Sequence, residues 1–308
     1  MRVLLTGVGG PAGSSLARQL HARGHWVAGV DVRDLPEAGI DHFSTVPFAI
    51  SPDYVPTLGS LCRELRIDAL IPSVSEELVI LSESVDAGLF DLPVLIGAPP
   101  AVTIANDKYV TACVLADAGV AVPAFGLPSR FGSAADAIRS LGGTVVLKPR
   151  VSRGGRGVVV IDEDAARTTW ACGRWAGLDD TLVVQRFAPG PEFAPVIFRA
   201  DPEAAPAALV VLEKTALKQG VVGNAVDVVR AAPGHRVTDR VAELTRSAVE
   251  AIGLIGPADV DVRLTEDGRP LVLEINARFG ANSARAPELL DAVLARLDAS
   301  VGLTHSAS

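Results

Sequence analysis

The stretch GRPLVLEINARFG, residues 268–280, constrains this chain most tightly, because it carries two polar side chains inside an apolar run. The apolar residues have the composition of a buried strand, yet Glu274 and Asn276 lie two positions apart among them. Side chains alternate between the two faces of a strand, so these two project from the same face. The strand must therefore aim a carboxylate and an amide at one place.

A turn directly upstream supplies a partner for this strand. Residues 258–264, ADVDVRL, form a strand-like run, and Asp267 and Gly268 are typical of a hairpin turn. With these two residues at the centre of the turn, Glu266 pairs with Arg269. Continued outward, the same register gives two polar pairs on one face: Asp261 with Glu274 and Asp259 with Asn276.

The acidic face of this hairpin allows two interpretations. Opposed carboxylates destabilise a sheet unless positive charge lies between them, and oxygen ligands of this kind suit Mg²⁺, which often shares them with substrate phosphates. One interpretation is therefore a magnesium site formed by Asp261, Glu274 and Asn276. The other is a solvated edge hairpin whose acids are neutralised by Arg263 and Arg278. The residues alone leave both open.

The rest of the chain shows two successive patterns. Residues 1–97 alternate strand and helix in the manner of a doubly wound α/β domain. A helix over 99–120, with Asn106 or Asp107 as a cap, then precedes a strand–turn–strand unit, further strands and the hairpin. A last helix is expected over about 283–298, followed by a disordered tail, GLTHSAS.

Bulk composition excludes several classes of protein. The 308 residues are 49% hydrophobic and 21% charged, as in a globular protein with a large core, and no apolar run reaches the length of a membrane span. The net charge of −8 argues against a general nucleic-acid binder. Three widely spaced cysteines favour neither a disulfide framework nor a thiolate metal site, so the cytoplasm is the expected compartment.

The first glycine-rich turn, TGVGGPAGSSL, is compatible with a nicotinamide cofactor. Gly7, Gly9 and Ala12 satisfy the GxGxxA pattern between a strand and a helix. Asp31 ends the next strand, where an acid that binds a ribose belongs. Taken alone, these residues predict an NAD(P)-dependent oxidoreductase or epimerase.

A second glycine-rich turn, SRGGRG, follows a strand that carries Lys148, one of only four lysines among the 28 basic residues. Glycines let backbone N–H groups approach a phosphate closely, and Lys148 supplies positive charge. A strand follows instead of a helix, so this is not a P-loop. The alternative is an ordinary mobile hairpin turn.

A third segment, LVVQRFAPGPEF, residues 182–193, joins two strands through a linker. A linker between lobes offers backbone groups to a flat ring, and Glu192 can accept hydrogen bonds from ribose hydroxyls. Alone, the segment is a weak indication of a nucleotide site.

In combination and in this order, four segments resemble the ATP-grasp superfamily: NDKYVTACVLADAGVAVP, VVLKP with its glycine-rich turn, VVQRFAPGPEF, and DVR followed by EDGRPLVLEINAR. The resemblance covers nearly the whole chain and points to the carbamoyl-phosphate-synthetase-like or amino-acid ligase branch. It implies an ATP-grasp fold of the α/β and α+β classes. Its parts would be a Rossmann-like domain over 1–97, a small α+β lobe with a glycine-rich phosphate lid over 98–182, and a larger C-terminal α+β lobe with an antiparallel sheet and the metal site over 183–308.

The resemblance also implies roles for single residues. Arg278 and Lys148 would be catalytic, and two Mg²⁺ ions, replaceable by Mn²⁺, would bind Asp261, Glu274 and Asn276. Within the ATP site, Gln185 to Ala188 would bracket adenine, largely through the backbone, and Glu192 would bind ribose. The whole ATP site would comprise Lys108, Lys148, Ser152, Gly154, Gly155, Gly157, Gln185, Arg186, Phe187, Ala188, Glu192 and Lys214. A substrate site is more loosely indicated at Gly9, Gly10, Glu76 and Arg285.

The implied activity is ATP-dependent ligation of a carboxylate to an amine through an acyl phosphate. It would form an amide or peptide bond on an amino acid or a small amino-acid-derived acid. The partners would be small molecules, without nucleic acid or membrane, and a homodimer is a candidate assembly. Two alternatives stay open: the nicotinamide-dependent enzyme, and a non-catalytic nucleotide-binding protein, which has no need of both metal carboxylates.

Overall fold

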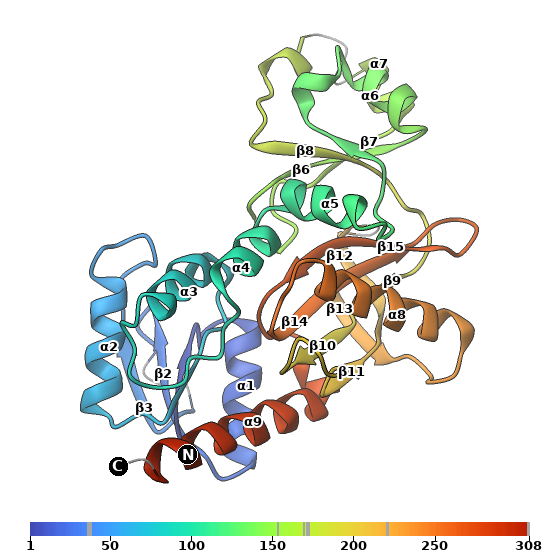
Figure 1. The fold of residues 1–308 in the computed structure, drawn as a ribbon. Helices are drawn as coiled ribbons and strands as arrows, with labels where there is room; N and C mark the ends of the chain where they lie inside the picture. Colours follow the sequence, from blue (N-terminus) through green and yellow to red (C-terminus); the bar gives the residue numbers. More distant parts are fainter. Residues whose placement is uncertain (36–38, 153, 169, 171–172, 220–221, 307–308) are drawn as a thin grey trace.

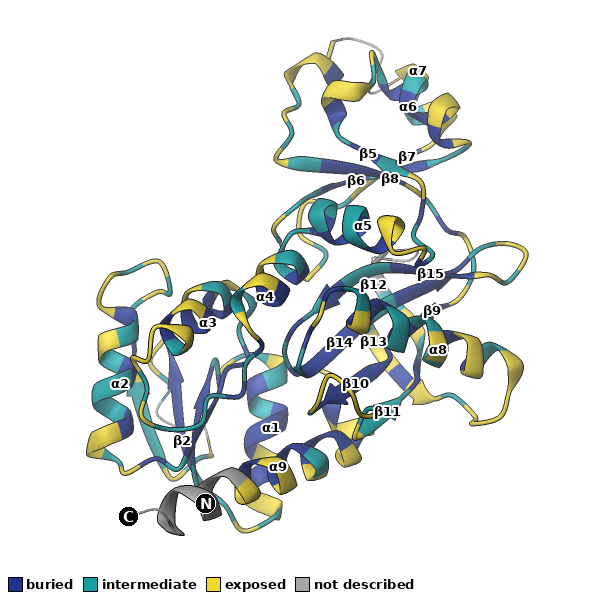
Figure 2. Cartoon of the chain, in the orientation of Figure 1, coloured by how far each residue is buried: buried dark blue, intermediate teal, exposed yellow. Residues whose placement is uncertain are grey.

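The protein is built on three sheets, shown in Figure 1 by a computed structural model that describes residues 1–35, 39–152, 154–168, 170, 173–219 and 222–306. Figure 2 shows that the strands of the sheets are mostly buried, whereas helices such as α2 (Tyr54–Glu64) and α8 (Arg236–Ala251) have exposed outer faces. In the described part of the chain, no helix combines the length and apolar character that a membrane crossing requires.

The N-terminal sheet is parallel, with the strand order β3-β2-β1-β4. Buried branched side chains on both faces of the central strands explain its stability, as expected for a sheet covered by helices on each side. The carboxyl ends of its strands lie at one edge, where α/β sheets bind ligands. Its elements are β1 (Arg2–Thr6), α1 (Pro11–Ala22), β2 (Trp26–Asp31), β3 (His42–Thr45), α2, β4 (Ala69–Ile71) and α3 (Leu78–Asp86).

The small lobe has an antiparallel sheet with the order β5-β8-β6-β7. Trp170 and Trp175 lie in its core, packed against α6 and the sheet. The hairpin of β6 and β7 carries the second glycine-rich turn. The elements are β5 (Phe125–Gly126), α6 (Ala134–Leu141), β6 (Val145–Pro149), β7 (Val159–Ile161), α7 (Glu163–Thr168) and β8 (Leu182–Arg186).

The C-terminal sheet has the order β11-β10-β14-β9-β12-β13, with β15 paired to β14, and every pair described is antiparallel. Helices α4, α5 and α8 share one apolar core with its central strands. The elements are α4 (Pro99–Asn106), α5 (Lys108–Asp117), β9 (Glu192–Phe193), β10 (Val196–Arg199), β11 (Ala208–Val210), β12 (Leu212–Gln219), β13 (Val222–Arg230), α8, β14 (Gly256–Leu264) and β15 (Pro270–Asn276).

The last helix, α9 (Pro287–Ser306), joins the first and last parts of the chain. Leu289 and Val293 pack in one cluster with Leu16 and Leu20 of α1, and Figure 1 shows α9 running beside α1. The prediction of a disordered tail is wrong as far as Ser306, because a helix nucleated by this apolar stripe extends at little cost. Residues 307 and 308 lie outside the described residues.

The single helix predicted over 99–120 is also wrong, because the chain is extended at Asp107 and separates α4 from α5. The Asp107 carboxylate accepts hydrogen bonds from the N–H groups of Tyr109 (2.9 Å) and Val110 (3.2 Å). The predicted cap at Asp107 is therefore confirmed, and it starts a new helix. The cap fixes Lys108 as the first residue of α5.

The turn of the β14–β15 hairpin differs from the prediction. Thr265 donates its N–H to the carbonyl of Arg269 (2.9 Å), so the loop has three residues and ends at Gly268, whose φ is 76°. The predicted pairing of Glu266 with Arg269 is therefore wrong. The glycine conformation allows this loop, which moves the neighbouring pairs by one residue.

A β-bulge at Leu273 restores the predicted register farther along the hairpin. Val262 pairs with Val272, and the next pair skips Leu273. Beyond the bulge lie the two predicted pairs, Asp261 with Glu274 and Asp259 with Asn276. The acidic face forms as predicted because two deviations of one residue cancel.

Gly13 tests how tightly α1 packs on the first glycine-rich turn. A Cβ at Gly13 would lie 2.2 Å from the carbonyl oxygen of Gly7, so we expect Gly13→Ala to lower the free energy of unfolding by about 1–3 kcal/mol. Gly59→Ala, inside α2, is the matched control, because its nearest neighbour is the Arg63 guanidinium at 3.8 Å. The control should stabilise by about 0.5–1 kcal/mol. Urea unfolding measures both, and equal changes would contradict the packing described.

Candidate active site

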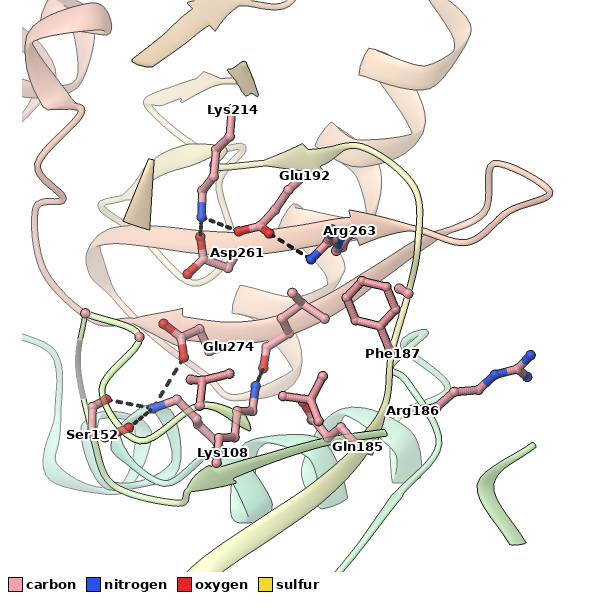
Figure 3. Close-up of a pocket in the computed structure, with 17 residues that line it drawn as sticks. Lys108, Ser152, Gln185, Arg186, Phe187, Glu192, Lys214, Asp261, Arg263 and Glu274 are labelled. Atoms are coloured by element: carbon pink, nitrogen blue, oxygen red, sulfur yellow. Dashed lines mark hydrogen bonds and ion pairs between the residues drawn. The ribbon is translucent and has the colours of Figure 1, made fainter. Parts of the chain in front are cut away.

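A cavity of about 770 Å³ lies between the small lobe and the C-terminal sheet (Figure 3). One part of its wall is apolar and the rest carries charged side chains from both lobes, which is typical of a small-molecule site. The apolar part consists of Val146, Val158, Phe187, Ala188 and Leu273. We refer to it as the interlobe cavity.

Two buried lysines and Glu274 form one end of the interlobe cavity. The Lys108 ammonium donates to the carbonyl of Ser152 (2.7 Å) and lies 3.3 Å from the Glu274 carboxylate. Lys148 reaches the carbonyl of Leu273 at 3.5 Å, so the bulge turns a backbone oxygen toward this lysine. Burial lowers the pKa of Lys148. Burial alone would raise the pKa of Glu274, but Lys108 and Lys148 hold it at about 2. This charge balance suits an anionic ligand.

A second group of charges comes from the C-terminal sheet (Figure 3). The Lys214 ammonium lies 2.5 Å from both Glu192 and Asp261, and Arg263 lies 3.4 Å from the other oxygen of Glu192. Burial alone would lower the pKa of Lys214, but the two carboxylates raise it. Burial also raises the pKa of Asp261 to about 8, with Glu274 contributing repulsion. The opposed acids of the hairpin are thus held by different lysines.

A second cavity of about 1090 Å³ adjoins the first and reaches the N-terminal domain. Arg278 lines it and donates to the side-chain oxygen of Asn276 (3.1 Å), while its contact with Asp259 is longer, at 3.9 Å. Glu274 and Lys214 border both cavities. A group held by Arg278 therefore lies next to one held by the lysines. We refer to this space as the Arg278 cavity.

The structure brings most of the predicted site residues together. Asn276 and Arg278 face the Arg278 cavity. The interlobe cavity is lined by Lys108, Lys148, Ser152, Gly154, Gly155, Gln185, Arg186, Phe187, Ala188, Glu192, Lys214, Asp261 and Glu274. Figure 3 shows the Arg186 side chain pointing away from the others, so its contribution here would be through the backbone.

The remaining predicted residues lie outside the interlobe cavity. Gly157 faces Pro149, whose ring would be 3.0 Å from an added Cβ. Arg285 is 61% exposed and pairs with Asp227 at 3.4 Å, so the structure does not bring it to the two cavities. Gly9, Gly10 and Glu76 border a third cavity in the N-terminal domain, and Gly10 also borders the Arg278 cavity.

The acid expected to hold a ribose in the N-terminal domain already has partners. The Asp31 carboxylate accepts the N–H of Gly9 (3.0 Å) and contacts the Arg33 guanidinium at 3.3 Å. Only 7% of Asp31 is exposed. Asp31 therefore stabilises the first glycine-rich turn and is not free to bind a ribose, which disfavours a nicotinamide cofactor.

Sequence reasoning missed several residues of the interlobe cavity. The sequence assigns Arg263 only a neutralising role, yet it lies two residues from Asp261 and on the same face of β14. Val146 likewise lies two residues from Lys148 on the same face of β6. That spacing was an available signal. The bulge at Leu273 had no signal in the hairpin pattern. Gln185, 3% exposed, has a buried amide nitrogen without a hydrogen-bond partner in the structure.

The hairpin face fits Mg²⁺ through the chemistry of its donors, although no group of three His, Cys, Asp or Glu side chains in the described residues could hold a metal alone. Asp261, Glu274 and Asn276 offer hard oxygens, and a magnesium shell completed by phosphate oxygens needs few protein ligands. Next to them, one oxygen of Asp259 is buried without a hydrogen-bond partner. A buried oxygen without a hydrogen-bond partner on this face suits a cation.

Comparison with known families gives one match. The family model of the ATP-grasp domain matches residues 105–282, which is more than half of the chain. No curated protein matches the sequence.

Several solved structures are similar. An L-amino acid ligase from Bacillus licheniformis has a TM-score of 0.66 and 20% identity over 92% of this chain and 68% of that one. A D-alanine-D-alanine ligase from Coxiella burnetii has a TM-score of 0.68 and 17% identity over 100% of this chain and 98% of that one. A biotin carboxylase from Campylobacter jejuni has a TM-score of 0.72 and 17% identity over 98% of this chain and 71% of that one. The predicted fold class is confirmed.

Lys214 is the cation that pairs with two carboxylates of the interlobe cavity, Glu192 and Asp261. In Lys214→Met, Glu192 and Asp261 would remain as buried carboxylates without their cation, so we expect the free energy of unfolding to fall by about 3–5 kcal/mol. Arg285→Met is the control, because it breaks a largely exposed ion pair and should cost less than about 1 kcal/mol. Urea unfolding in a buffer with EDTA compares them, and similar small losses would refute the importance of Lys214.

Proposed function

This chain belongs to the ATP-grasp family, and we propose that it joins a carboxylate to an amine with consumption of ATP. The predicted membership is confirmed, and with it the class of enzyme, an ATP-binding ligase. The finer proposal, an amide bond formed on an amino acid or a small related acid, is carried by one observation. Asp261 and Glu274 face each other across a hairpin where the interlobe cavity meets the Arg278 cavity.

The interlobe cavity would hold ATP along its length. The apolar wall around Leu273 and Phe187 suits a purine ring, and the unpartnered amide of Gln185 offers the ring a hydrogen-bond donor. The N–H groups of Arg186 and Phe187 already donate to backbone carbonyls, so other backbone groups of 185–188 would bracket adenine. Ribose would lie toward Glu192, and the phosphates toward the two lysines at the other end.

The phosphate end of the cavity supplies what phosphoryl transfer requires, which is positioning and positive charge. Asp261, Glu274 and Asn276 would hold two Mg²⁺ ions, and bound Mg²⁺ would neutralise charge on the phosphates. Lys108 and Lys148 would contact the phosphates directly, and their burial strengthens the attraction. Arg278 would orient the substrate carboxylate beside the terminal phosphate.

The reaction would proceed in two steps. A carboxylate oxygen forms a bond to the terminal phosphorus, the bond to the ADP oxygen breaks, and ADP leaves with the electron pair. The amine then forms a bond to the carbonyl carbon of the acyl phosphate, and phosphate departs with its electron pair and receives the amine proton. Gly154 and Gly155, which line the cavity, would act as part of a lid that keeps water from the acyl phosphate.

The three-part division at residues 97/98 and 182/183 is proposed as the framework for this chemistry. It is supported by the presence of three sheets and by the position of the interlobe cavity between the last two. The second boundary falls at the start of β8, whose residues 183–186 complete the sheet of the small lobe. A non-catalytic role is disfavoured because Lys148, Asp261, Glu274, Asn276 and Arg278 are all present around the two cavities.

Glu274→Ala tests the metal carboxylate. ADP formation in the presence of a mixture of amino acids and hydroxylamine should fall by about 10²–10³-fold, because a group that stabilises transferred charge is lost. Glu288→Ala, which breaks an exposed pair with Arg230, is the control and should keep wild-type turnover. Circular dichroism checks that both variants stay folded. Near-normal turnover of Glu274→Ala would refute the assignment.

Nucleotide preference separates the ligase from the oxidoreductase alternative. We expect Mg·ADP to raise the melting temperature, since binding to the folded state stabilises it, and NADPH to leave it unchanged, since Asp31 is already engaged. Differential scanning fluorimetry at equal ligand concentrations measures both shifts. Stabilisation by NADPH alone would overturn the proposed function.

A further inference from the structure

The third cavity, about 1680 Å³, is larger than the other two and lies in the N-terminal domain. It opens where β1, β2, β3 and β4 end, the edge at which α/β sheets bind ligands. Its walls include the turn after β1, the end of β2, the segment after β3 and part of the second glycine-rich turn. We refer to it as the N-terminal crevice.

The N-terminal crevice adjoins the Arg278 cavity. It shares five wall residues with the Arg278 cavity: Gly7, Gly10, Pro11, Val74 and Gly154. The first glycine-rich turn therefore faces both the crevice and the cavity that holds Arg278. Gly154 borders all three cavities, so one backbone turn contacts the nucleotide site and the crevice together.

One wall of the crevice is apolar and open to solvent. Val30 and Val46 are buried in it, while Val32 is 42% exposed and Phe48 is 68% exposed. Phe48 is the most exposed aromatic ring among the large hydrophobic side chains of the described residues. Exposed apolar side chains gathered at the mouth of a cavity are typical of a ligand contact.

The crevice also carries guanidinium groups from two different parts of the chain. Arg33 follows β2, is 62% exposed and lies beside Gly9, where its nitrogen would be 2.5 Å from an added Cβ. Arg156 enters from the second glycine-rich turn and is exposed. Two guanidinium groups over a glycine turn suit a carboxylate, which arginine binds through paired hydrogen bonds.

The floor of the crevice is a closed hydrogen-bond network. Thr6 and Tyr54 donate their hydroxyls to the Glu77 carboxylate, and the N–H groups of Ser73 (3.1 Å) and Val74 (2.9 Å) donate to it as well. Because these groups hydrogen-bond to one another, we expect a ligand of the crevice to be bound by the apolar wall and the two arginines.

We propose that the N-terminal crevice binds the amine substrate and that this substrate is an apolar α-amino acid. Its carboxylate pairs with Arg33 and Arg156, its side chain packs on Val46 and Phe48, and its amine points past Gly10 toward the Arg278 cavity. This rests on the proposed function and deepens it by naming the amine. Attack of the amine on the acyl phosphate forms the C–N bond, breaks the C–O bond to phosphate and transfers the amine proton to the departing phosphate.

Hydroxylamine separates the proposed function from this inference, because it is small enough to trap an acyl phosphate without filling the crevice. The twenty amino acids and a set of simple carboxylic acids are screened as hydroxamate donors with Mg·ATP, and mass spectrometry identifies the donor. Amide formation by that donor is then compared with L-phenylalanine, phenethylamine and ammonium as amines. We expect KM for L-phenylalanine to lie at least about tenfold below that for the other two, because only it offers the carboxylate and the ring together.

Variants assign this preference to the crevice, with the hydroxamate rate of each variant as its internal reference. Phe48→Ser and Arg156→Gln should each lower the ratio of amide to hydroxamate formed with L-phenylalanine by about tenfold. Arg156→Gln should also remove most of the preference over phenethylamine. The controls are Leu89→Ser and Arg139→Gln, exposed residues that do not line the crevice, which should keep the wild-type ratio.

The possible failures are distinct. Absence of any hydroxamate overturns the proposed function and the inference with it. Hydroxamate formation with ammonium as the preferred amine overturns the inference alone, as does an unchanged amide ratio in both crevice variants.

Discussion

The arrangement of this enzyme depends on two carboxylates that face each other across one hairpin. Asp261 and Glu274 would repel each other if left alone, and the surrounding structure compensates with three buried lysines. Lys214 contacts Asp261, while Lys108 contacts Glu274 and Lys148 lies near it. The lysines come from separate sheets and a helix, so neutralising the hairpin also fixes how the lobes meet. The interlobe cavity is the space left between these charges.

The same arrangement explains why three cavities adjoin. The helix α9 packs against α1 and brings the N-terminal sheet to the C-terminal one, so the ends of the parallel strands lie beside Arg278. The turn at Gly154 then borders all three of these cavities. Nucleotide, carboxylate and amine would therefore meet at one place, and a single turn would cover them, which is what a water-sensitive intermediate requires.

Much of the site could be predicted because its chemistry follows strand alternation and a few ordered motifs. The hairpin face formed as predicted, although only because a three-residue loop and the bulge at Leu273 offset each other. Neither deviation can be read from alternation. The loop depends on the left-handed conformation of Gly268, and the bulge accompanies a tertiary contact between Lys148 and the Leu273 carbonyl. The prediction that Arg285 lies at the substrate site fails for a simpler reason. Its position after the metal strand does not determine where a side chain on the following turn points. The N-terminal crevice needed coordinates, because four strand ends and a distant turn form it.

The central claim is that the substrate carboxylate is activated by direct phosphorylation, and isotope transfer tests it most directly. The carboxylate substrate is labelled with ¹⁸O, the reaction is run with unlabelled Mg·ATP and the amine, and the released phosphate is analysed by mass spectrometry. Attack of the carboxylate on the terminal phosphorus predicts one ¹⁸O in each phosphate released with amide formation. Amide formation with unlabelled phosphate would contradict the account.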